Sequence, residues 1–353
     1  MDSRIVGVDV GGANLKYAAL TGQSVSRSFP MWRQPESLAE TVVDDLRSNF
    51  EGGRAIKHLA VTMTGELADC FVDRAEGVSQ IVSHLVQAAS ALAIEDVQFY
   101  GVDGGFHDAS WAATHVDVIA AANWHALASW VGRSVAADAT LIDIGSTTTD
   151  IVPIADGRVA TQSQTDFDRL REGSLVYVGC RRTPVCALVD SLLLRGDEVP
   201  VMNELFATID DAMILVNATG EDRDDCDSAD GKPRTLDHAA ARMARMLGLD
   251  RRSISTADAK VLAEQIVTSA IRRVGEGLSQ IGFGPTVVIS GHGSQLIDLP
   301  SGLSVIRLAD TLGADTARSA PALAVATLRR LQLDQEAGET IGSSERRAEV
   351  SGP

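Results

Sequence analysis

A short pattern of an apolar strand, an aspartate and a glycine turn occurs twice in this chain. Residues 9–20 read DVGGANLKYAAL and residues 143–154 read DIGSTTTDIVPI, and each follows an apolar run, Ile5–Val8 and Thr140–Ile142. Because both segments continue directly into a second apolar run, each predicts two strands joined by a tight turn. Two such hairpins predict a duplicated fold that holds a polyphosphate between its halves.

Both turns contain the residue types that bind phosphate and magnesium. A glycine turn lets backbone N–H groups approach an anion closely, and an aspartate at the end of a buried strand can hold Mg²⁺, usually through water. We therefore predict Asp9 and Asp143 as the metal-binding carboxylates, with turn capping as the alternative. The predicted phosphate ligands are Gly11, Gly12, Asn14 and Lys16 in the first turn, and Gly145, Ser146, Thr147 and Thr148 in the second.

A third glycine motif ends another apolar strand, Val287–Ser294 (VVISGHGS). We expect a helix to begin near Ser294, and a strand, a glycine turn and a helix N-terminus together form a site for an anion or a nucleotide. Gly291, His292 and Gly293 are therefore predicted to lie at the ligand, the two glycines by close backbone approach.

Two acidic residues are candidates for acid–base chemistry. Glu66 follows the predicted strand Leu59–Thr64, and ligands gather at the carboxyl ends of strands in open α/β sheets. We predict Glu66 as the base for an attacking hydroxyl group, with a surface glutamate at a helix start as the alternative. Asp103 lies after the next strand in a glycine-rich loop and is a second catalytic candidate.

Three basic residues are candidates for contact with phosphate. Lys16 lies seven residues after Asp9, and regular strand alternation would place the two on opposite faces, but the glycine turn interrupts that count. We predict Lys16 as a catalytic, phosphate-contacting residue rather than a solvated edge lysine. Arg181 and Arg182 can bind diphosphate or carboxylate bidentately, or form an ordinary surface pair.

Composition limits the classes of function. The 353 residues carry a formal net charge of −17, which argues against nucleic acid as a partner and requires local donors and metal to hold any phosphate. No run of eighteen apolar residues and no basic-plus-apolar leader is present, so we expect neither a membrane span nor export, and a cytoplasmic location. We expect the four cysteines to be free thiols, with a catalytic role for Cys70 as the alternative.

Alternating strand and helix patterns predict an α/β protein with two lobes. The first lobe spans residues 1–139 and the second 140–333, with an irregular inserted segment at about 165–235. Residues 334–353 are polar and lack aromatic residues, so we expect a disordered tail. Trp111, Trp124 and Trp130 are expected in the core.

The order and spacing of these motifs resemble the superfamily of actin, sugar kinases and heat-shock ATPases. Within it, the chain resembles the hydantoinase/oxoprolinase-related branch from about residue 4 to 330, and most closely the proteins of tetrahydromethanopterin-linked one-carbon transfer. The segments that carry this resemblance are Asp9–Lys16, Val61–Leu67, Ala122–Trp124, Asp143–Asp150, Gly173–Gly179, Arg181–Pro184 and Ala241–Met246.

The resemblance implies a duplicated actin-like (ribonuclease H-like) ATPase fold, in which two lobes enclose a central ligand cleft. It also implies a transferase of methanofuran biosynthesis, in which a phenol of the tyramine or tyrosine type displaces diphosphate from a furanmethylamine diphosphate. Magnesium is the implied cofactor and a phosphorylated small molecule the implied partner; homo-oligomerisation stays open. Two alternatives remain: an ATP-dependent small-molecule kinase or ATPase, and a non-catalytic nucleotide-binding assembly protein.

Overall fold

The computed structural model describes residues 4–50 and 55–350, with side chains as far as Ala337. The chain forms two compact units. The first contains Met1–Asp138, Ile154–Thr165 and Leu308–Pro353, and the second contains Ala139–Pro153 and Asp166–Arg307. The second unit is thus inserted into the first, because the chain leaves the first unit and returns to it twice.

The first unit is built on a six-stranded mixed sheet in the order β3-β2-β1-β4-β5-β6. The first hairpin motif forms the antiparallel pair β1–β2, and β4 and β5 add to β1 in parallel. The carboxyl ends of these three parallel strands therefore lie at one edge of the sheet. The strands are β1 Ile5–Gly11, β2 Asn14–Ala19, β3 Ser24–Ser28, β4 His58–Thr64, β5 Asp96–Tyr100 and β6 Phe106–His107.

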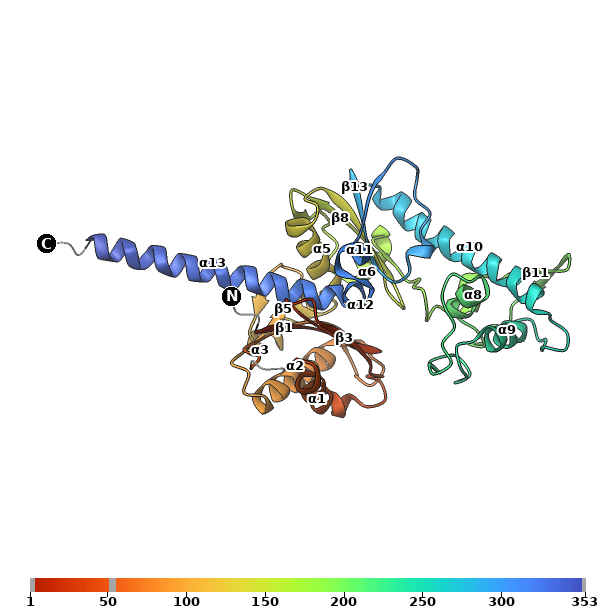
Figure 1. Cartoon of the computed structure of the whole chain (residues 1–353), viewed down its shortest axis with the longest axis horizontal. Coiled ribbons are helices and arrows are strands. Elements are labelled where there is room, and N and C mark those ends of the chain that lie inside the picture. The colour runs from red at the N-terminus through yellow and green to blue at the C-terminus, as the bar shows by residue number, and fades with distance from the viewer. Residues whose placement is uncertain (1–3, 51–54, 351–353) are drawn as a thin grey trace. The chain divides into compact units, whose positions relative to one another are not determined.

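Helices cover both faces of this sheet (Figure 1). Alternate residues of β1, including Val8, pack in one core with α1 (Leu38–Phe50) and α2 (Arg74–Ala91). On the opposite face, β1 contacts α13 (Ala320–Val350), which also packs on α5 (Asn123–Ser134). The short helices of this unit are η1 Pro35–Ser37, α3 Ala109–Ala112, α4 Val116–Ile119, α11 Leu308–Leu312 and α12 Ala314–Arg318.

The C-terminal helices belong to the first unit, whereas we expected the second lobe to extend to residue 333. Arg329 donates to Asp96 of β5 at 2.7 Å. At Gly7 of β1 the backbones approach so closely that a Cβ atom would stand 1.8 Å from the carbonyl oxygen of Ala322. An apolar helical pattern does not reveal which sheet it covers, so the sequence could not assign α13.

The C-terminal tail also differs from the expectation. The structure continues α13 to Val350, so residues 334–350 are helical where we expected disorder. This stretch is rich in Gln, Glu, Ala and Arg, which favour helix even without an apolar face. Residues 351–353 of the expected tail lie outside the described residues.

The second unit repeats the arrangement with a sheet in the order β10-β8-β7-β13-β14. The short strand β9 pairs with Ile154 and Ala155 at the end of β8, and these residues belong to the first unit. The second hairpin motif supplies β7 and β8, and β13 and β14 run parallel to β7. Long helix α10 (Thr256–Ile281) shares the core of this unit with α8 (Ile209–Leu215) and α9 (Leu236–Arg245). The strands are β7 Ala139–Ile144, β8 Thr149–Ala155, β9 Arg158–Val159, β10 Leu175–Val176, β13 Thr286–Gly291 and β14 Ser304–Arg307.

The segment expected to be irregular, residues 165–235, contains several short elements. Each is too short for periodicity to detect it. They are α6 Asp166–Glu172, α7 Val185–Leu188, β11 Ser191–Leu194, β12 Asp197–Pro200 and α8 Ile209–Leu215; α9 (Leu236–Arg245) follows directly.

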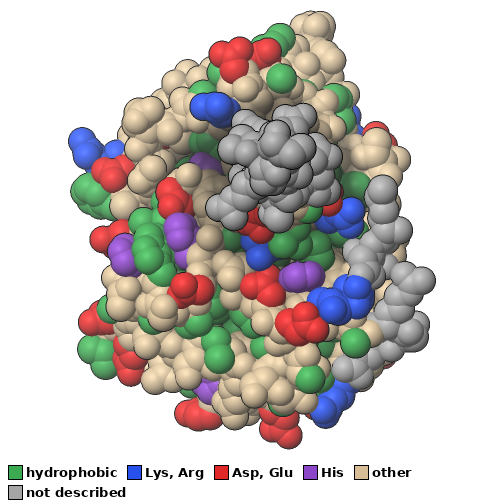
Figure 2. All heavy atoms as spheres, turned by 90° about the vertical axis from the view of Figure 1, so that its left-hand side faces the viewer, with side chains coloured by type: hydrophobic (Ala, Val, Ile, Leu, Met, Phe, Trp, Pro, Cys, Tyr) green, Lys and Arg blue, Asp and Glu red, His purple; other side chains and the backbone are tan. Residues whose placement is uncertain are grey.

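The surface is strongly acidic, with 48 Asp and Glu residues against 31 Lys and Arg. Figure 2 shows acidic side chains spread over one face of the molecule. None of the described helices is both long and apolar enough to cross a membrane.

Candidate functional site

The first turn brings Asp9 and Lys16 together on one face of the sheet. The two residues are direct cross-strand partners in the β1–β2 hairpin, so their side chains share a face. The Lys16 ammonium lies 3.4 Å from a carboxylate oxygen of Asp9, whose residue is only 2% exposed. The glycine turn thus does interrupt the strand alternation that would have separated them.

Close backbone packing fixes this turn against the end of β4. The Gly65 N–H donates to the Val10 carbonyl at 3.0 Å, and a Cβ atom at Gly65 would stand 3.1 Å from the carbonyl carbon of Gly11. The Gly12 carbonyl in turn accepts a hydrogen bond from the Met31 N–H at 3.0 Å. Asn14 begins β2 beside the turn, half-buried.

Glu66 is buried rather than exposed, being 1% accessible. It lies two residues beyond β4, and Arg74 Nε of helix α2 is 4.0 Å from its Oε1. Gly77 allows α2 to approach, since a Cβ atom there would stand 2.0 Å from the Glu66 carbonyl oxygen. A surface glutamate is therefore the wrong description of this residue.

Asp103 lies after β5, at the sheet edge that also carries Asp9. Its Oδ1 accepts from the Gly105 N–H at 3.0 Å, and its Oδ2 lies 2.9 Å from Nε2 of His107. The His107 ring stacks on Trp111, with 3.7 Å between the ring centroids. This pairing with an imidazole was not foreseen from the sequence.

Of the three tryptophans expected in the core, two are buried there, Trp124 and Trp130. Trp111 is only half-buried. It lies between the rings of His107 and His115, each with its centroid 3.7 Å away.

The second turn is closed by a hydrogen bond from the Gly145 N–H to the Thr148 carbonyl at 2.9 Å. Asp143 precedes it near the end of β7 and is the register partner of Ser290 in β13. Ser146 and Thr147 form the tip of the turn. The second unit therefore places an aspartate and a glycine turn at the end of a central strand, as the first unit does.

The third glycine motif lies directly beside the second turn. Gly291 has φ +79°, and a Cβ atom there would stand 2.1 Å from the Ile144 carbonyl oxygen. The His292 N–H donates to the same oxygen at 3.1 Å, and a Cβ atom at Gly293 would come within 2.2 Å of Ile144 Cγ2. The expected helix at Ser294 is only a three-residue 3₁₀ turn, so no α-helix N-terminus reinforces this loop.

The arginine pair is attached to the second turn by its backbone. The N–H groups of Arg181 and Arg182 both donate to the Ser146 carbonyl, at 3.1 and 2.8 Å. Gly179 makes this approach feasible, because a Cβ atom there would stand 2.4 Å from the Thr147 nitrogen. The Arg181 side chain points to Asp225, with its Nη2 3.0 Å from a carboxylate oxygen, whereas Arg182 is exposed.

Asp225 belongs to an arginine–aspartate network around the inserted segment. Its partial burial raises the pKa of the carboxyl, but a hydrogen bond from the Asp227 N–H and the charges of Arg181 and Arg234 outweigh burial and leave the pKa lowered. Arg234 lies 3.5 Å from Asp225 and also bonds bidentately to Asp210. Arg181 is therefore held by a connected set of charges.

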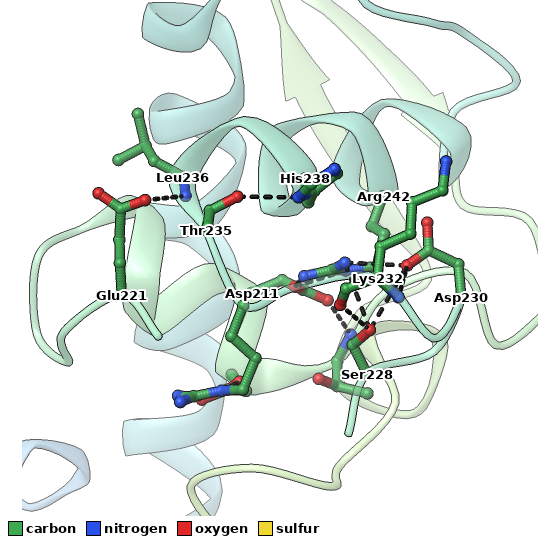
Figure 3. A network of polar contacts seen from close by, with 12 residues as sticks. Asp211, Glu221, Ser228, Asp230, Lys232, Thr235, Leu236, His238 and Arg242 are labelled. Atoms are coloured by element: carbon green, nitrogen blue, oxygen red, sulfur yellow. Dashed lines mark hydrogen bonds and ion pairs between the residues drawn. The ribbon is translucent and has the colours of Figure 1, made fainter. Parts of the chain in front are cut away.

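The same network continues to the fully buried Arg242 (Figure 3). Its guanidinium lies 2.7 Å from Asp211 and 2.9 Å from Asp230. Partial burial raises the pKa of Asp230, but hydrogen bonds from Arg245 and Arg242 outweigh it and hold the pKa at about 2. The loop that carries Asp225 and Asp230 is thus tied to α8 and α9 by ion pairs.

One buried arginine beside the second turn was missed. In the sequence repeat, Asp150 occupies the position that Lys16 has in the first copy. Asp150 accepts a hydrogen bond from Arg169 of α6 at 2.7 Å, and Arg169 also donates to the Ser174 carbonyl at 3.0 Å. The repeat could have drawn attention to position 150. However, Arg169, the ion-pair partner of Asp150, lies in a segment without helix or strand periodicity.

The donor set suits magnesium but contains no preformed metal cage. Asp9 and Asp143 are carboxylates, which are the hard oxygen ligands that Mg²⁺ prefers, and Mg²⁺ usually keeps several waters. Among the described residues, no group of three or more His, Cys, Asp or Glu side chains could hold a metal. All four cysteines are free, and burial raises the pKa of the Cys70 thiol, which disfavours a thiolate nucleophile.

Comparison with solved structures finds the same fold. Nucleotide-free acetone carboxylase, an enzyme of ATP-dependent acetone carboxylation, aligns with a TM-score of 0.51 and 10% identity over 91% of this chain and 70% of that one. The activator of 2-hydroxyisocaproyl-CoA dehydratase from Clostridium difficile, with bound ADPNP, gives a TM-score of 0.45 at 14% identity over 95% and 97% of the chains.

Comparison of sequences gives nearer relatives. A (4-{4-[2-(gamma-L-glutamylamino)ethyl]phenoxymethyl}furan-2-yl)methanamine synthase of Methanocaldococcus jannaschii is 32% identical over 95% of this chain and 100% of its own length. A protein of the same name from Methanococcus vannielii is 29% identical over 59% of this chain and 97% of its own. The hydantoinase/oxoprolinase family model matches residues 58–332, most of the chain. The chain therefore belongs to the hydantoinase/oxoprolinase family.

Proposed function

We propose that this chain is a transferase of methanofuran-linked one-carbon metabolism that condenses a furanmethylamine diphosphate with a phenolic acceptor and releases diphosphate. The observation that carries the proposal is the 32% identity, over 95% of this chain and the whole of the relative, to a protein named as a synthase. The name of that relative describes a phenoxymethyl-furan, which is an aryl ether of a furanmethyl group.

The reaction forms one bond and breaks one. The phenol oxygen attacks the furanmethyl carbon, and the bond from that carbon to the diphosphate oxygen breaks, so that diphosphate leaves with the electron pair. The phenol proton passes to a base. Glu66 is the first candidate, since it is buried at the end of β4, and Asp103 with its neighbour His107 is the second.

Departure of diphosphate concentrates negative charge on its oxygens, and fixed donors aimed at that charge lower the barrier. In the first unit, we assign this role to the Gly11–Gly12 turn, Asn14 and Lys16. In the second unit, we assign the same charge-stabilising role to residues 145–148, to Gly291–Gly293 and to the Arg181–Arg182 pair.

Magnesium is the proposed cofactor, and Asp9 and Asp143 would hold it, chiefly through water. The ion would neutralise charge on the leaving diphosphate. We further propose that the protein acts in a reducing, cytoplasmic environment, which its four free thiols support.

One experiment tests the proposal against its rivals. Purified protein with magnesium is incubated with a furanmethylamine diphosphate and a tyramine-type phenol, and released diphosphate and the ether product are measured. Parallel reactions replace the furan substrate with ATP or omit the phenol. Ether and diphosphate formed in equal amounts support the transferase. Phosphate released from ATP without furan would support a kinase or ATPase, and ligand binding without any turnover would support a non-catalytic role.

A further inference from the structure

Each metal-associated aspartate has a buried hydroxyl group directly beside it on the neighbouring strand. Asp9 in β1 is the register partner of Thr62 in the parallel strand β4. Asp143 in β7 is the register partner of Ser290 in the parallel strand β13. Register partners in a sheet present their side chains on the same face, with strands about 4.8 Å apart. The two units therefore repeat a carboxylate–hydroxyl pair.

The two hydroxyls occupy equivalent places in the two sheets. In the first unit, the aspartate strand lies between its hairpin partner and the strand with Thr62, in the order β2-β1-β4. In the second unit, the order β8-β7-β13 places Ser290 in the same way. Both pairs lie near the carboxyl ends of their strands, where the glycine turns begin.

The fold does not explain why either position carries a hydroxyl group. Thr62 and Ser290 are each 1% exposed, and among the described residues the Oγ atom of neither has a hydrogen-bond partner. A buried polar group without a partner costs about 1–3 kcal/mol, so native proteins retain few of them without a functional reason. Valine or alanine would fill these strand positions at no such cost.

We propose that Thr62 and Ser290 are ligand-binding residues that complete the two aspartate positions, each hydroxyl sharing with its neighbouring carboxylate a water molecule bound to magnesium. This inference rests on the proposed function, because it requires a magnesium–diphosphate ligand. The chemistry fits, since Mg²⁺ retains its waters and these waters donate hydrogen bonds to carboxylate and hydroxyl oxygens. Residues that hold a metal-bound group in this way commonly affect metal affinity about 10–100-fold.

The test measures magnesium affinity rather than activity. Wild-type protein and the variants Thr62→Val, Thr62→Ser and Ser290→Ala are titrated with Mg²⁺ in the presence of inorganic diphosphate, by calorimetry and by melting temperature. Ser319→Ala is the matched control, because Ser319 is equally buried and its Oγ also lacks a described partner, but it lies between α12 and α13 rather than beside an aspartate.

Thr62→Val and Ser290→Ala are expected to weaken magnesium binding about tenfold. Without metal, both should melt at or above the wild-type temperature, because an unsatisfied buried hydroxyl has been removed. Thr62→Ser and Ser319→Ala should titrate like the wild type.

Wild-type magnesium affinity in both Thr62→Val and Ser290→Ala would overturn the inference while leaving the proposed function intact. A lower metal-free melting temperature with unchanged affinity would also overturn it, by showing that the hydroxyls are structural. A wild-type protein that does not respond to magnesium and diphosphate at all would contradict the proposed function, and the inference with it.

Discussion

Replacement of Gly179 by alanine should damage the second turn, because the loop at Gly179, which follows β10, packs directly on the backbone of that turn. The added methyl group would stand 2.4 Å from the Thr147 nitrogen and 2.5 Å from the Ser146 carbonyl carbon. Ordinary contacts of this kind are about 3.5 Å, so one backbone must move by about 1 Å. No flexible side chain is available to absorb the change.

The magnitude follows from that displacement. Overpacking of a well-packed site costs about 1–3 kcal/mol, and each kcal/mol lowers the melting temperature of a domain of 150–250 residues by about 2–4 °C. A displacement of about 1 Å at a binding site can cost up to about 100-fold in activity. We therefore expect Gly179→Ala to lower the melting temperature by several degrees. We expect the variant to lose proportionally more of its diphosphate affinity than of its stability.

Gly275→Ala is the matched control. Gly275 lies inside α10, and a Cβ atom there would meet nothing within 4 Å. Alanine in a helix interior is more favourable than glycine by about 0.5–1 kcal/mol, so this variant should melt slightly higher and bind normally. Both proteins are compared by thermal melting and by calorimetry with magnesium and diphosphate. If Gly179→Ala melts and binds like the wild type, the second turn is not held as the structure describes.

Four further predictions address the charged residues. Asp9→Asn and Asp143→Asn should each reduce turnover about 100-fold or more with an unchanged melting temperature; wild-type rates at matched magnesium would refute the two-turn arrangement. At least one of Arg181→Ala and Arg182→Ala should weaken diphosphate binding by about 1.5–3 kcal/mol; an unchanged calorimetric affinity in both variants would make the pair ordinary surface charge. Arg242→Met should destabilise the protein by about 3–5 kcal/mol, because a buried aspartate loses its charge partner. The lowered pKa of Asp230, about 2, means that its contribution to stability is present above its ordinary pKa near 4 and is lost as the pH falls toward 2. The melting temperatures of wild type and Asp230→Asn should therefore converge as the pH is lowered from about 5 to about 2.

The sequence predicted the duplicated α/β architecture because each hairpin combines an apolar strand, an aspartate and a glycine turn within twelve residues. It also predicted that the glycine turn interrupts the strand alternation between Asp9 and Lys16, and the hairpin register pairs the two residues. Local pattern was sufficient for these features, because each is decided by residues close together in the chain.

Features that depend on distant residues were not predictable in this way. Thr62 and Ser290 lie inside apolar strands. In the sequence alone each looks like an ordinary strand residue, because the aspartate beside it belongs to a different strand. Arg169 is 19 residues from Asp150 and lies in a segment without periodicity. The assignment of α13 to the first unit required the contact between Gly7 and Ala322, which no local pattern encodes.

That contact has a consequence for how the protein is made. The first unit joins Gly7 of β1 to Ala322 of α13, far along the chain, so its sheet lacks the α13 cover until that helix has been synthesised. Closing a loop that long is entropically costly and slow, and contacts of high sequence separation form late. The inserted second unit, by contrast, has its whole sequence available once residue 307 has been synthesised. A ribosome-bound chain would thus hold a finished second unit while the first unit still exposes the face of β1 that α13 will cover, and this interval is when the nascent protein most needs protection from aggregation.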